Sequence, residues 1–497
     1  MPHLPESMVE KIMNNLTSNR DRNSASLVNK LWYTVDGNSR RTVYVSNCYA
    51  VSPSRVIDRF PNLRSLILKS NSGISYPRFD SNDWDGTVDP WIDAMCRNCP
   101  LLEELRLKRM IVSDQNLDVI STRFPNFKSL VLSSCSGFTI AGLSAIASNC
   151  SKLEQLEVER CDITDHTGVW LRSFPESLSS LVSLNISCIK GEVNPTDVSQ
   201  LVARCPNLTT LSLRKTVSLD TVRRILMKSP QLVHLGVGST LQNSLRSFLQ
   251  LSLSLNNRES IQSLEFFHRI PKMLLHVFYP VCVNLVFLNV RFAAILPSIE
   301  LINFIKKCTK LRRLWVRGGC IGDEGLEAVS NTCKNLEDLR VYPGTKGYSV
   351  TEVGLTAIST GCQKLKTLTY FCSQMTNTAL VTFSKNCPNV TRFKLIISTP
   401  KQPDHTTLQP FDHGFGAIVQ SCKGLVKLTA SGLLTNDVFL YIGMYAERLE
   451  VLSVPGGCES DDAGMQYVIN GCKNLKKVKN ITASDFGDAQ SANIYEY

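Results

Sequence analysis

A nine-residue pattern, Cys-x-x-Leu-x-x-Leu-x-Leu, recurs along this chain of 497 residues and restricts its fold more than any other feature. Ten copies open with a cysteine, namely Cys99, Cys150, Cys205, Cys282, Cys308, Cys333, Cys362, Cys387, Cys422 and Cys472. Six further copies keep the apolar phase behind a different first residue, namely Phe60, Phe124, Leu178, Ser229, Arg258 and Ala446. Most neighbouring copies start 24 to 29 residues apart, so the sequence predicts one repeat array instead of several unrelated domains.

Each copy has room for one short strand and one helix. This is the period of leucine-rich repeats, whose units stack because neither element can bury its apolar face alone. Counted from the cysteine position, side chains at +6 and +8 are expected in the core, whereas those at +5, +7 and +9 face the concave side. Residues 140–147 are typical of the helices that form the convex wall. The predicted fold class is therefore α/β, a solenoid with a parallel sheet on its concave face and helices on its convex face.

Two spacings between copies are much longer than the others. They measure 39 residues after Phe60 and 35 residues after Cys387, and a smaller excess follows Cys333. Insertions in solenoids fall in loops on one face, which is often the binding face. Residues 70–84, 343–350 and 397–413 are therefore candidate ligand-framing loops, with neutral surface insertions as the alternative.

Basic residues outnumber acidic ones at the predicted concave positions. The thirteen basic residues are Lys69, Arg106, Lys108, Arg214, Arg291, Arg313, Arg317, Arg340, Arg392, Lys394, Lys427, Lys477 and Lys479. The five acidic residues are Glu104, Glu157, Glu159, Glu265 and Asp338. Like charges on neighbouring strands are tolerable when a compact, highly charged anion screens them, and the net charge of +11 favours such a partner. A solvated basic face without a specific ligand is the alternative, and nucleic acid is disfavoured because few aromatic residues are interleaved.

The segment before the repeats predicts a small group of helices. Apolar residues recur at helical spacing over residues 9–16 and 27–35, and Leu4-Pro5-Glu6 is typical of a helix start. A helical hairpin of this size cannot bury all of its apolar surface, so part of it should dock onto a partner. The pattern LPxxxVxxI followed by SLVxKxWY resembles an F-box, which implies binding to the Skp-type adaptor of a cullin-RING ubiquitin ligase. The F-box core and adaptor-facing residues would be Leu4, Pro5, Val9, Ile12, Leu27, Val28 and Trp32. We assign residues 1–42 to the F-box and 43–497 to about sixteen repeats.

Several segments resemble the plant auxin receptors of the transport inhibitor response and auxin-signalling F-box family. They include RDRNSASLV at 20–28, NCYAVSP at 47–53, PWIDAM at 90–95, YFCSQMTN at 370–377 and TRFKL at 391–395. The resemblance implies a nuclear receptor that recognises a degron of Aux/IAA repressors and carries inositol hexakisphosphate as a cofactor. The matching residues for the inositol phosphate are Lys69, Lys108, Arg109, Arg340, Arg392, Lys401, Lys427, Lys476 and Lys477. The family continues for about two repeats and a cap beyond the point at which this sequence stops.

The hormone pocket implied by the resemblance is altered. Its matching positions are Lys394, Phe371, Thr429, Ala430 and Ser453. Lys394 stands where the family has an arginine and lacks the planar two-pronged guanidinium. Three aromatic or imidazole positions of the second-repeat loop fall on Gly73, Ile74 and Pro77. Three functions therefore stay open: an auxin-gated ligase receptor, a ligase receptor for another degron, and a scaffold or nucleic-acid-binding repeat protein.

Other classes of protein are disfavoured by the sequence. No apolar run is long enough for a membrane span, and the first thirty residues are too charged for a signal peptide, so we expect an intracellular protein. Cysteines at one equivalent position per repeat are typical of buried free thiols. Cys96 and Cys99 form a lone CxxC, whereas a structural zinc ion needs four ligands. We predict neither a metal site nor a catalytic site.

Overall fold

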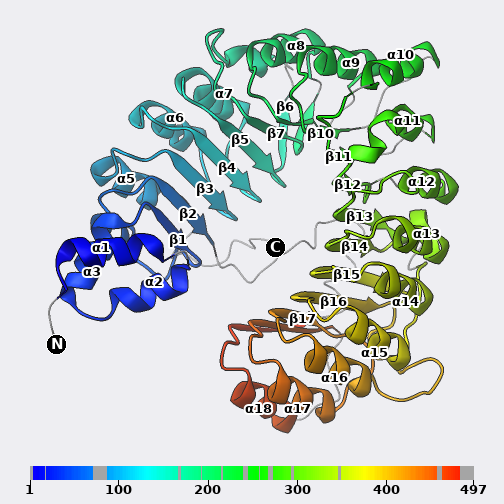
Figure 1. Cartoon of the computed structure of the whole chain (residues 1–497). Helices are drawn as coiled ribbons and strands as arrows, with labels where there is room; N and C mark the ends of the chain where they lie inside the picture. Colours follow the sequence, from blue (N-terminus) through cyan, green and yellow to red (C-terminus); the bar gives the residue numbers. More distant parts are fainter. Residues whose placement is uncertain are drawn as a thin grey trace. The chain divides into compact units, whose positions relative to one another are not determined.

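The structure is a computed structural model, and it describes residues 4–16, 18–70, 87–165, 169–191, 193–213, 217–238, 245–256, 258–266, 272–292, 296–344, 349–455 and 462–481. The chain divides into two compact units, Met1–Thr216 and Val217–Tyr497, which we call unit 1 and unit 2. Each unit is described by itself. In both units, helices cover one side of a parallel sheet (Figure 1).

Unit 1 begins with three short helices, α1 (Glu6–Asn15), α2 (Asn19–Ser26) and α3 (Lys30–Ser39). The Ser18 hydroxyl accepts a hydrogen bond from the backbone N–H of Asp21, and the Asn29 side chain caps α3 in the same way. Such caps satisfy N–H groups that have no partner in the first turn of a helix. Val9, Met13 and Val35 form the small core between the helices.

The sheet of unit 1 is parallel, and its strands follow one another in chain order. The strands are β1 (Thr42–Val45), β2 (Ser65–Lys69), β3 (Glu104–Lys108), β4 (Ser129–Ser133), β5 (Gln155–Glu159), β7 (Ser183–Ile186) and β9 (Thr210–Leu213). The helical segments between them are α4 (Pro53–Arg59), α5 (Asp89–Asn98), α6 (Asp114–Arg123), α7 (Ile140–Asn149), η1 (Trp170–Ser173) and α8 (Pro195–Arg204). A separate two-stranded sheet joins β6 (Ile163–Asp165) to β8 (Ile189–Gly191).

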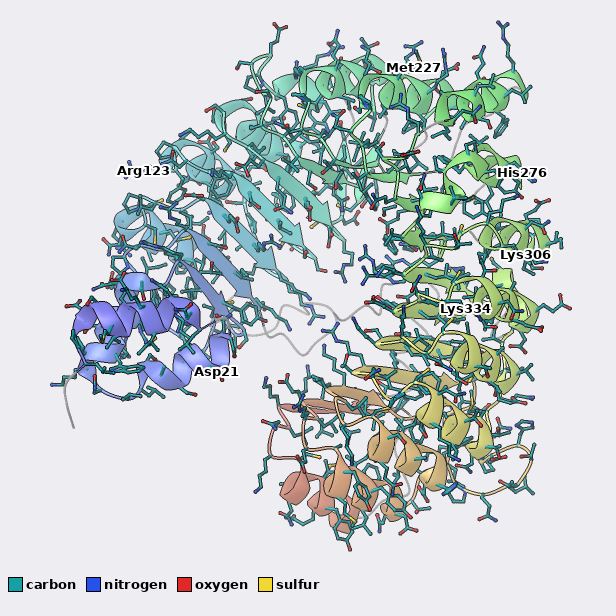
Figure 2. All side chains as sticks on the ribbon, viewed as in Figure 1. Asp21, Arg123, Met227, His276, Lys306 and Lys334 are labelled. Carbon is teal, nitrogen blue, oxygen red and sulfur yellow. The ribbon has the colours of Figure 1, made fainter. Side chains whose placement is uncertain are left out.

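Unit 2 repeats the same arrangement. Its strands are β10 (His234–Val237), β11 (Ser263–Phe266), β12 (Phe287–Asn289), β13 (Arg313–Arg317), β14 (Asp338–Tyr342), β15 (Thr367–Cys372), β16 (Arg392–Ile397), β17 (Lys427–Thr429), β18 (Val451–Pro455) and β19 (Lys477–Ile481). Its helical segments are α9 (Leu219–Lys228), α10 (Leu245–Leu255), α11 (Lys272–Val277), η2 (Tyr279–Asn284), α12 (Ser298–Ile305), α13 (Gly318–Thr332), α14 (Glu352–Gly361), α15 (Asn377–Asn386), α16 (Asp412–Ser421), α17 (Asn436–Tyr445) and α18 (Asp462–Gly471). The labelled side chains Met227, His276 and Lys306 lie on the helical side (Figure 2).

The strand register confirms the predicted alternation of core and concave positions. Leu314, Leu339 and Leu368 occupy +6 of consecutive repeats, pair directly across β13, β14 and β15, and are at most 1% exposed. Their burial follows from the period of two in a strand, which sends alternate side chains to opposite faces of the sheet. The predicted solenoid of parallel strands and outer helices is therefore present in each unit.

The described part contains one sheet strand more than the sixteen that the repeat pattern predicted. This strand, β1, pairs with β2 and continues directly from the last helix of the amino-terminal group. Its cysteine position is occupied by Gly37 in α3, where an added Cβ would lie 2.6 Å from the carbonyl oxygen of Arg59. The pattern missed the strand because two apolar positions of the motif are lost: Gly37 stands at the first position, where the close contact requires a glycine, and Arg40 stands at +3 in place of leucine.

The cysteines at the repeat starts are buried free thiols, as predicted. All described cysteines are free, and only Cys96 among them is not buried. The Sγ of Cys333 donates to the carbonyl of Cys308, and Cys362 donates in turn to Cys333, both over 3.5 Å. Burial raises the pKa of Cys333 to about 12, so this thiol stays protonated and unreactive. Among the described helices, none is long and apolar enough to cross a bilayer.

Candidate functional sites on the F-box helices and the concave strands

The three amino-terminal helices leave large apolar side chains in solvent. They include Leu4 at 42%, Met8 at 53%, Ile12 at 38%, Leu27 at 79% and Val28 at 62%. Met8 and Ile12 lie four residues apart and share one face of α1, whereas Val9 on the same helix is fully buried. Trp32 packs against the small core, and Pro5 stands at the N-cap of α1. Five of the predicted adaptor residues, Pro5 included, are therefore exposed, and Val9 belongs to the core.

A buried carboxylate joins these helices to the first repeat. Asp36 in α3 is completely buried and accepts hydrogen bonds from three arginines. Its Oδ1 lies 2.8 Å from Nε of Arg22 and 3.0 Å from Nη2 of Arg40, and its Oδ2 lies 3.3 Å from Nη2 of Arg59. Arg59 ends α4 of the first repeat, so the carboxylate ties the two parts of unit 1 together.

Part of the predicted inositol phosphate set lies in unit 1. Lys69 and Lys108 pair directly in the register of β2 and β3, so two ammonium groups end neighbouring strands. Arg109 follows with a positive φ of 58°, and its backbone N–H donates to the carbonyl of Ser133 over 2.9 Å. An L residue adopts this left-handed conformation rarely, and here it turns the chain directly after the basic pair. The structure therefore brings these three predicted residues together.

The other residues predicted to bind the inositol phosphate lie in unit 2, on or next to different strands. Arg392 pairs with Lys427 in the register of β16 and β17, and Lys477 lies two strands farther along at the same level. Arg340 is held by Asp338 over 3.0 Å. Lys476 forms a 2.8 Å ion pair with Glu450 before the strands begin. Their assignment to an inositol phosphate stays a prediction.

Lys401 is exposed on segment 398–411, which lies within the predicted loop 397–413. A backbone hydrogen bond at Pro400 and the side chains of Asp404 and His405 hold this segment in place. The N–H of Gly432 donates to the carbonyl of Pro400 over 2.7 Å, and Asp404 Oδ2 accepts from the N–H of Asn377 at the start of α15 over 2.6 Å. Burial raises the pKa of Asp404, but hydrogen bonds from Asn377 and two neighbouring threonines outweigh this and lower it to about 2.

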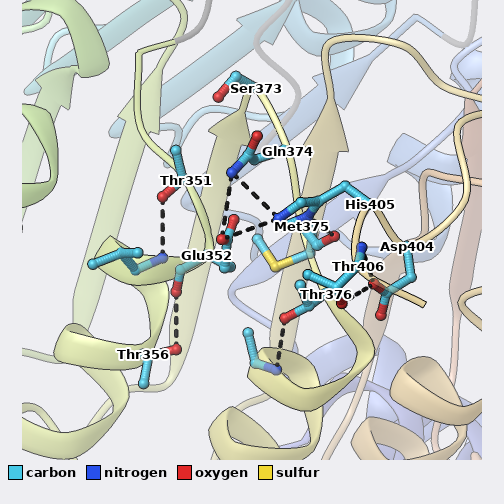
Figure 3. A network of polar contacts seen from close by, with 12 residues as sticks. Thr351, Glu352, Thr356, Ser373, Gln374, Met375, Thr376, Asp404, His405 and Thr406 are labelled. Atoms are coloured by element: carbon cyan, nitrogen blue, oxygen red, sulfur yellow. Dashed lines mark hydrogen bonds and ion pairs between the residues drawn. The ribbon is translucent and has the colours of Figure 1, made fainter. Parts of the chain in front are cut away.

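His405 adds a second anchor to segment 398–411 (Figure 3). Its Nε2 lies 3.5 Å from a carboxylate oxygen of Glu352 at the start of α14, and its Nδ1 lies 3.1 Å from the carbonyl of Met375. Gln374 approaches the same carboxylate oxygen over 3.4 Å. The segment is therefore an ordered part of unit 2, fixed across two consecutive repeats.

The predicted hormone residues of unit 2 lie on four adjacent strands. Lys394, Thr429 and Ser453 occupy one row across β16, β17 and β18. Phe371 on β15 lies beside them, and the Nζ of Lys394 is 5.3 Å from its ring centroid. Ala430 is 1% exposed and its backbone N–H donates to the carbonyl of Ser453 over 3.1 Å. Gly73, Ile74 and Pro77 lie outside the described residues.

The chemistry of this row is that of an anion site beside an aromatic ring. Burial, and then the charge of Arg340, lower the pKa of Lys394 to about 8. A desolvated ammonium group next to a like charge favours a carboxylate ligand, because the ligand restores a counter-charge that water no longer supplies. Thr429 and Ser453 add hydroxyl groups that can donate hydrogen bonds.

The concave aromatic residues of unit 2 lie closer together than the repeat pattern predicted. Phe287, Trp315, Tyr342 and Phe371 form one buried cluster with Ile396. The signal was available, because Phe287 stands at +5, Trp315 at +7 and Tyr342 at +9 of three consecutive repeats, which is a diagonal across neighbouring strands. Each repeat taken alone contributes few aromatic residues, so the diagonal is visible only when neighbouring repeats are compared.

Two family models match the chain. The model described as F-box matches residues 1–42, and the model described as SKP2 LRR domain matches residues 88–295. A rice protein named transport inhibitor response 1-like (Oryza sativa subsp. japonica) is 48% identical over all of this chain and 87% of its own length.

Two proteins of Arabidopsis thaliana are also similar to the chain. GRR1-like protein 1 is 41% identical over 97% of this chain and 83% of its own length. Coronatine-insensitive protein 1 is 29% identical over 95% of this chain and 81% of its own length. The sequence is therefore more similar to the first of these two proteins than to the second.

Proposed function

The chain belongs to the plant family of F-box and leucine-rich-repeat receptors that includes the transport inhibitor response 1-like proteins, and we propose that it is the substrate-recognition subunit of an SCF-type cullin-RING ubiquitin ligase. The observation that carries this proposal is the solvent-exposed apolar set Leu4, Met8, Ile12, Leu27 and Val28 on helices that precede the repeats. Exposed apolar side chains gathered on a few short helices are typical of a docking surface. The chain would act by binding, with the chemistry supplied by other subunits.

Capture of a Skp-type adaptor by the full chain tests the proposal. Leu27→Ser combined with Val28→Ser should abolish capture, because both side chains are more than 60% exposed and contribute to a partner without supporting the fold. Val353→Ser, an equally exposed site on α14, is the matched control and should leave capture unchanged. Failure of the unaltered chain to capture the adaptor would favour a scaffold without ligase function, and capture that survives the double substitution would contradict the assigned docking surface.

Binding of inositol hexakisphosphate is a finer part of the proposal. Its support is the direct pairing of Lys69 with Lys108 and of Arg392 with Lys427, because one anion that contacts both members of a pair relieves the repulsion between them. Thermal unfolding with and without inositol hexakisphosphate should show stabilisation that grows with ligand concentration. Replacing Arg392 and Lys427 by glutamine should reduce this stabilisation, and an unchanged shift would contradict the assignment.

We propose further that the receptor is gated by auxin and recruits an Aux/IAA-like degron in the nucleus. The support is the row of Lys394, Thr429 and Ser453 beside Phe371, which offers a cation, hydroxyl groups and a ring to a small aromatic acid. Capture of a degron peptide should increase when auxin is added. Equal capture with and without auxin would instead favour a receptor for another degron, consistent with a lysine at the carboxylate position. A fluorescent fusion tests the location.

A further inference from the structure

A row of aromatic rings crosses the concave face of unit 2 from β12 to β15. The rings belong to Phe287, Trp315, Tyr342 and Phe371, which are 6%, 7%, 8% and 6% exposed. Phe287 and Trp315 meet edge to face with centroids 5.1 Å apart, and Tyr342 and Phe371 are 6.3 Å apart. Because these strands are hydrogen-bonded neighbours (Figure 1), the rings form one floor, which we call the ring row.

Cationic side chains cover the ring row. The distances to ring centroids are 4.4 Å for Arg313 over Phe287, 4.3 Å for Arg340 over Trp315, 5.9 Å for Arg291 over Tyr342 and 5.3 Å for Lys394 over Phe371. A guanidinium group stacked on a ring is held in place by the ring quadrupole. Its N–H donors point outward in its own plane, where they match a carboxylate.

The charge of this face is strongly one-sided. Among the described concave positions from β12 to β16, the basic residues are Arg291, Arg313, Arg317, Arg340, Arg392 and Lys394. Asp338 is the acidic one, and it is paired with Arg340. Arg291, Arg313 and Arg317 lie outside the set predicted for the inositol phosphate. Arg313 and Arg317 lie on one strand, β13, and their charges favour an anionic ligand other than that ion.

We propose that the ring row and its arginines bind an extended acidic segment of a protein partner, with carboxylates on Arg313 and Arg317. Arg313 and Arg317 lie four residues apart on β13, which corresponds to about 13 Å along the strand. An extended chain covers this distance with about five residues. The inference rests on the proposed function in one respect only, namely that the partner is the protein recruited by the receptor.

Single-stranded nucleic acid fits this surface less well than an acidic peptide. Bases bind such proteins by stacking on open aromatic faces. Here the rings are at most 8% exposed and their faces are occupied by cations, so no platform for bases is left. The outward donors of the arginines are suited to carboxylates instead.

The test measures binding of a fluorescein-labelled six-residue peptide of alternating glutamate and serine to the full chain, in saturating inositol hexakisphosphate. The same peptide with glutamine for glutamate should not bind. Arg313→Gln combined with Arg317→Gln should weaken binding about tenfold or more, because two charge-assisted contacts are lost. Arg312→Gln combined with Lys366→Gln is the matched control, since both side chains contact Glu337 and are more than half exposed.

The control removes the same amount of charge from the same unit and should leave the affinity unchanged. Equal weakening of peptide binding in both double variants would show that the peptide is attracted by net charge alone, and this result would overturn the inference. Loss of all peptide binding in inositol hexakisphosphate would overturn it too, because the arginines would then belong to that ion's site. Tighter binding of oligothymidylate than of the peptide would replace it with a nucleic-acid surface. Adaptor capture is scored separately, so failure of the ligase proposal is distinguishable from failure of this one.

Discussion

Replacing Asp36 by asparagine tests whether the buried carboxylate couples the F-box to the repeats. The substitution keeps the shape of the side chain but removes the charge that faces Arg22, Arg40 and Arg59. Breaking a buried ion network from one side typically costs about 3 to 5 kcal/mol, because the remaining charges stay buried without compensation. Asparagine retains one acceptor oxygen, so we expect the lower figure, about 3 kcal/mol.

Hydrogen exchange of the backbone amides in α3 and α4 measures this cost locally, which is preferable because a chain of two units need not unfold in one step. A loss of about 3 kcal/mol accelerates exchange through local opening roughly 150-fold. Glu103→Gln is the control, because its carboxylate contacts Arg64 and Lys128 and these partners are 51% and 37% exposed. An exposed pair contributes about 0 to 1 kcal/mol.

The reasoning is refuted if Asp36→Asn accelerates exchange no more than the control does. In that case the three arginines would be sufficiently solvated to tolerate the loss of the carboxylate, and the junction would be held by packing alone.

Three other predictions concern unit 2. The native pKa of Lys394, about 8, lies below its ordinary value of 10.5, so folding disfavours the protonated form. The free energy of unfolding should therefore rise as the pH increases from about 8 to 10.5. Lys394→Met should flatten this rise, as measured by urea unfolding. Asp404 has a native pKa of about 2, so its contribution to stability is present above its ordinary pKa of 3.8 and is lost as the pH falls through about 2. At neutral pH, Asp404→Asn should speed hydrogen exchange of the backbone amides in 398–411. Unchanged exchange would contradict the role of Asp404 as an anchor of this segment. Gly354→Ala places a Cβ 2.5 Å from Oδ1 of Asp323 and should destabilise by about 1 to 3 kcal/mol, seen as a lower Tm; an unchanged Tm would show that the contact relaxes freely.

The strand positions were predictable because their signal is local and repeated. Leu339 at +6 and Arg340 at +7 were assigned to opposite faces from spacing alone, and the structure places them so. The same reasoning could not detect β1, since Gly37 and Arg40 replace two apolar residues of the motif. They make contacts with the backbone of Arg59 and with Asp36 that no apolar pattern records. For the candidate sites, spacing identified which lysines and arginines face the concave side but not which of them have acidic partners.

The sequence by itself determined the period, the parallel sheet and the side of the sheet on which each strand residue lies, because alternation along a strand depends only on backbone geometry. The tertiary structure alone decided that Asp36 gathers three arginines, that segment 398–411 is anchored through Asp404, and that Arg313 and Arg340 lie on aromatic rings. These contacts join residues that are distant in the chain or depend on side-chain conformation. Their formation depends on the packing of neighbouring repeats, which the periodicity of the sequence does not predict.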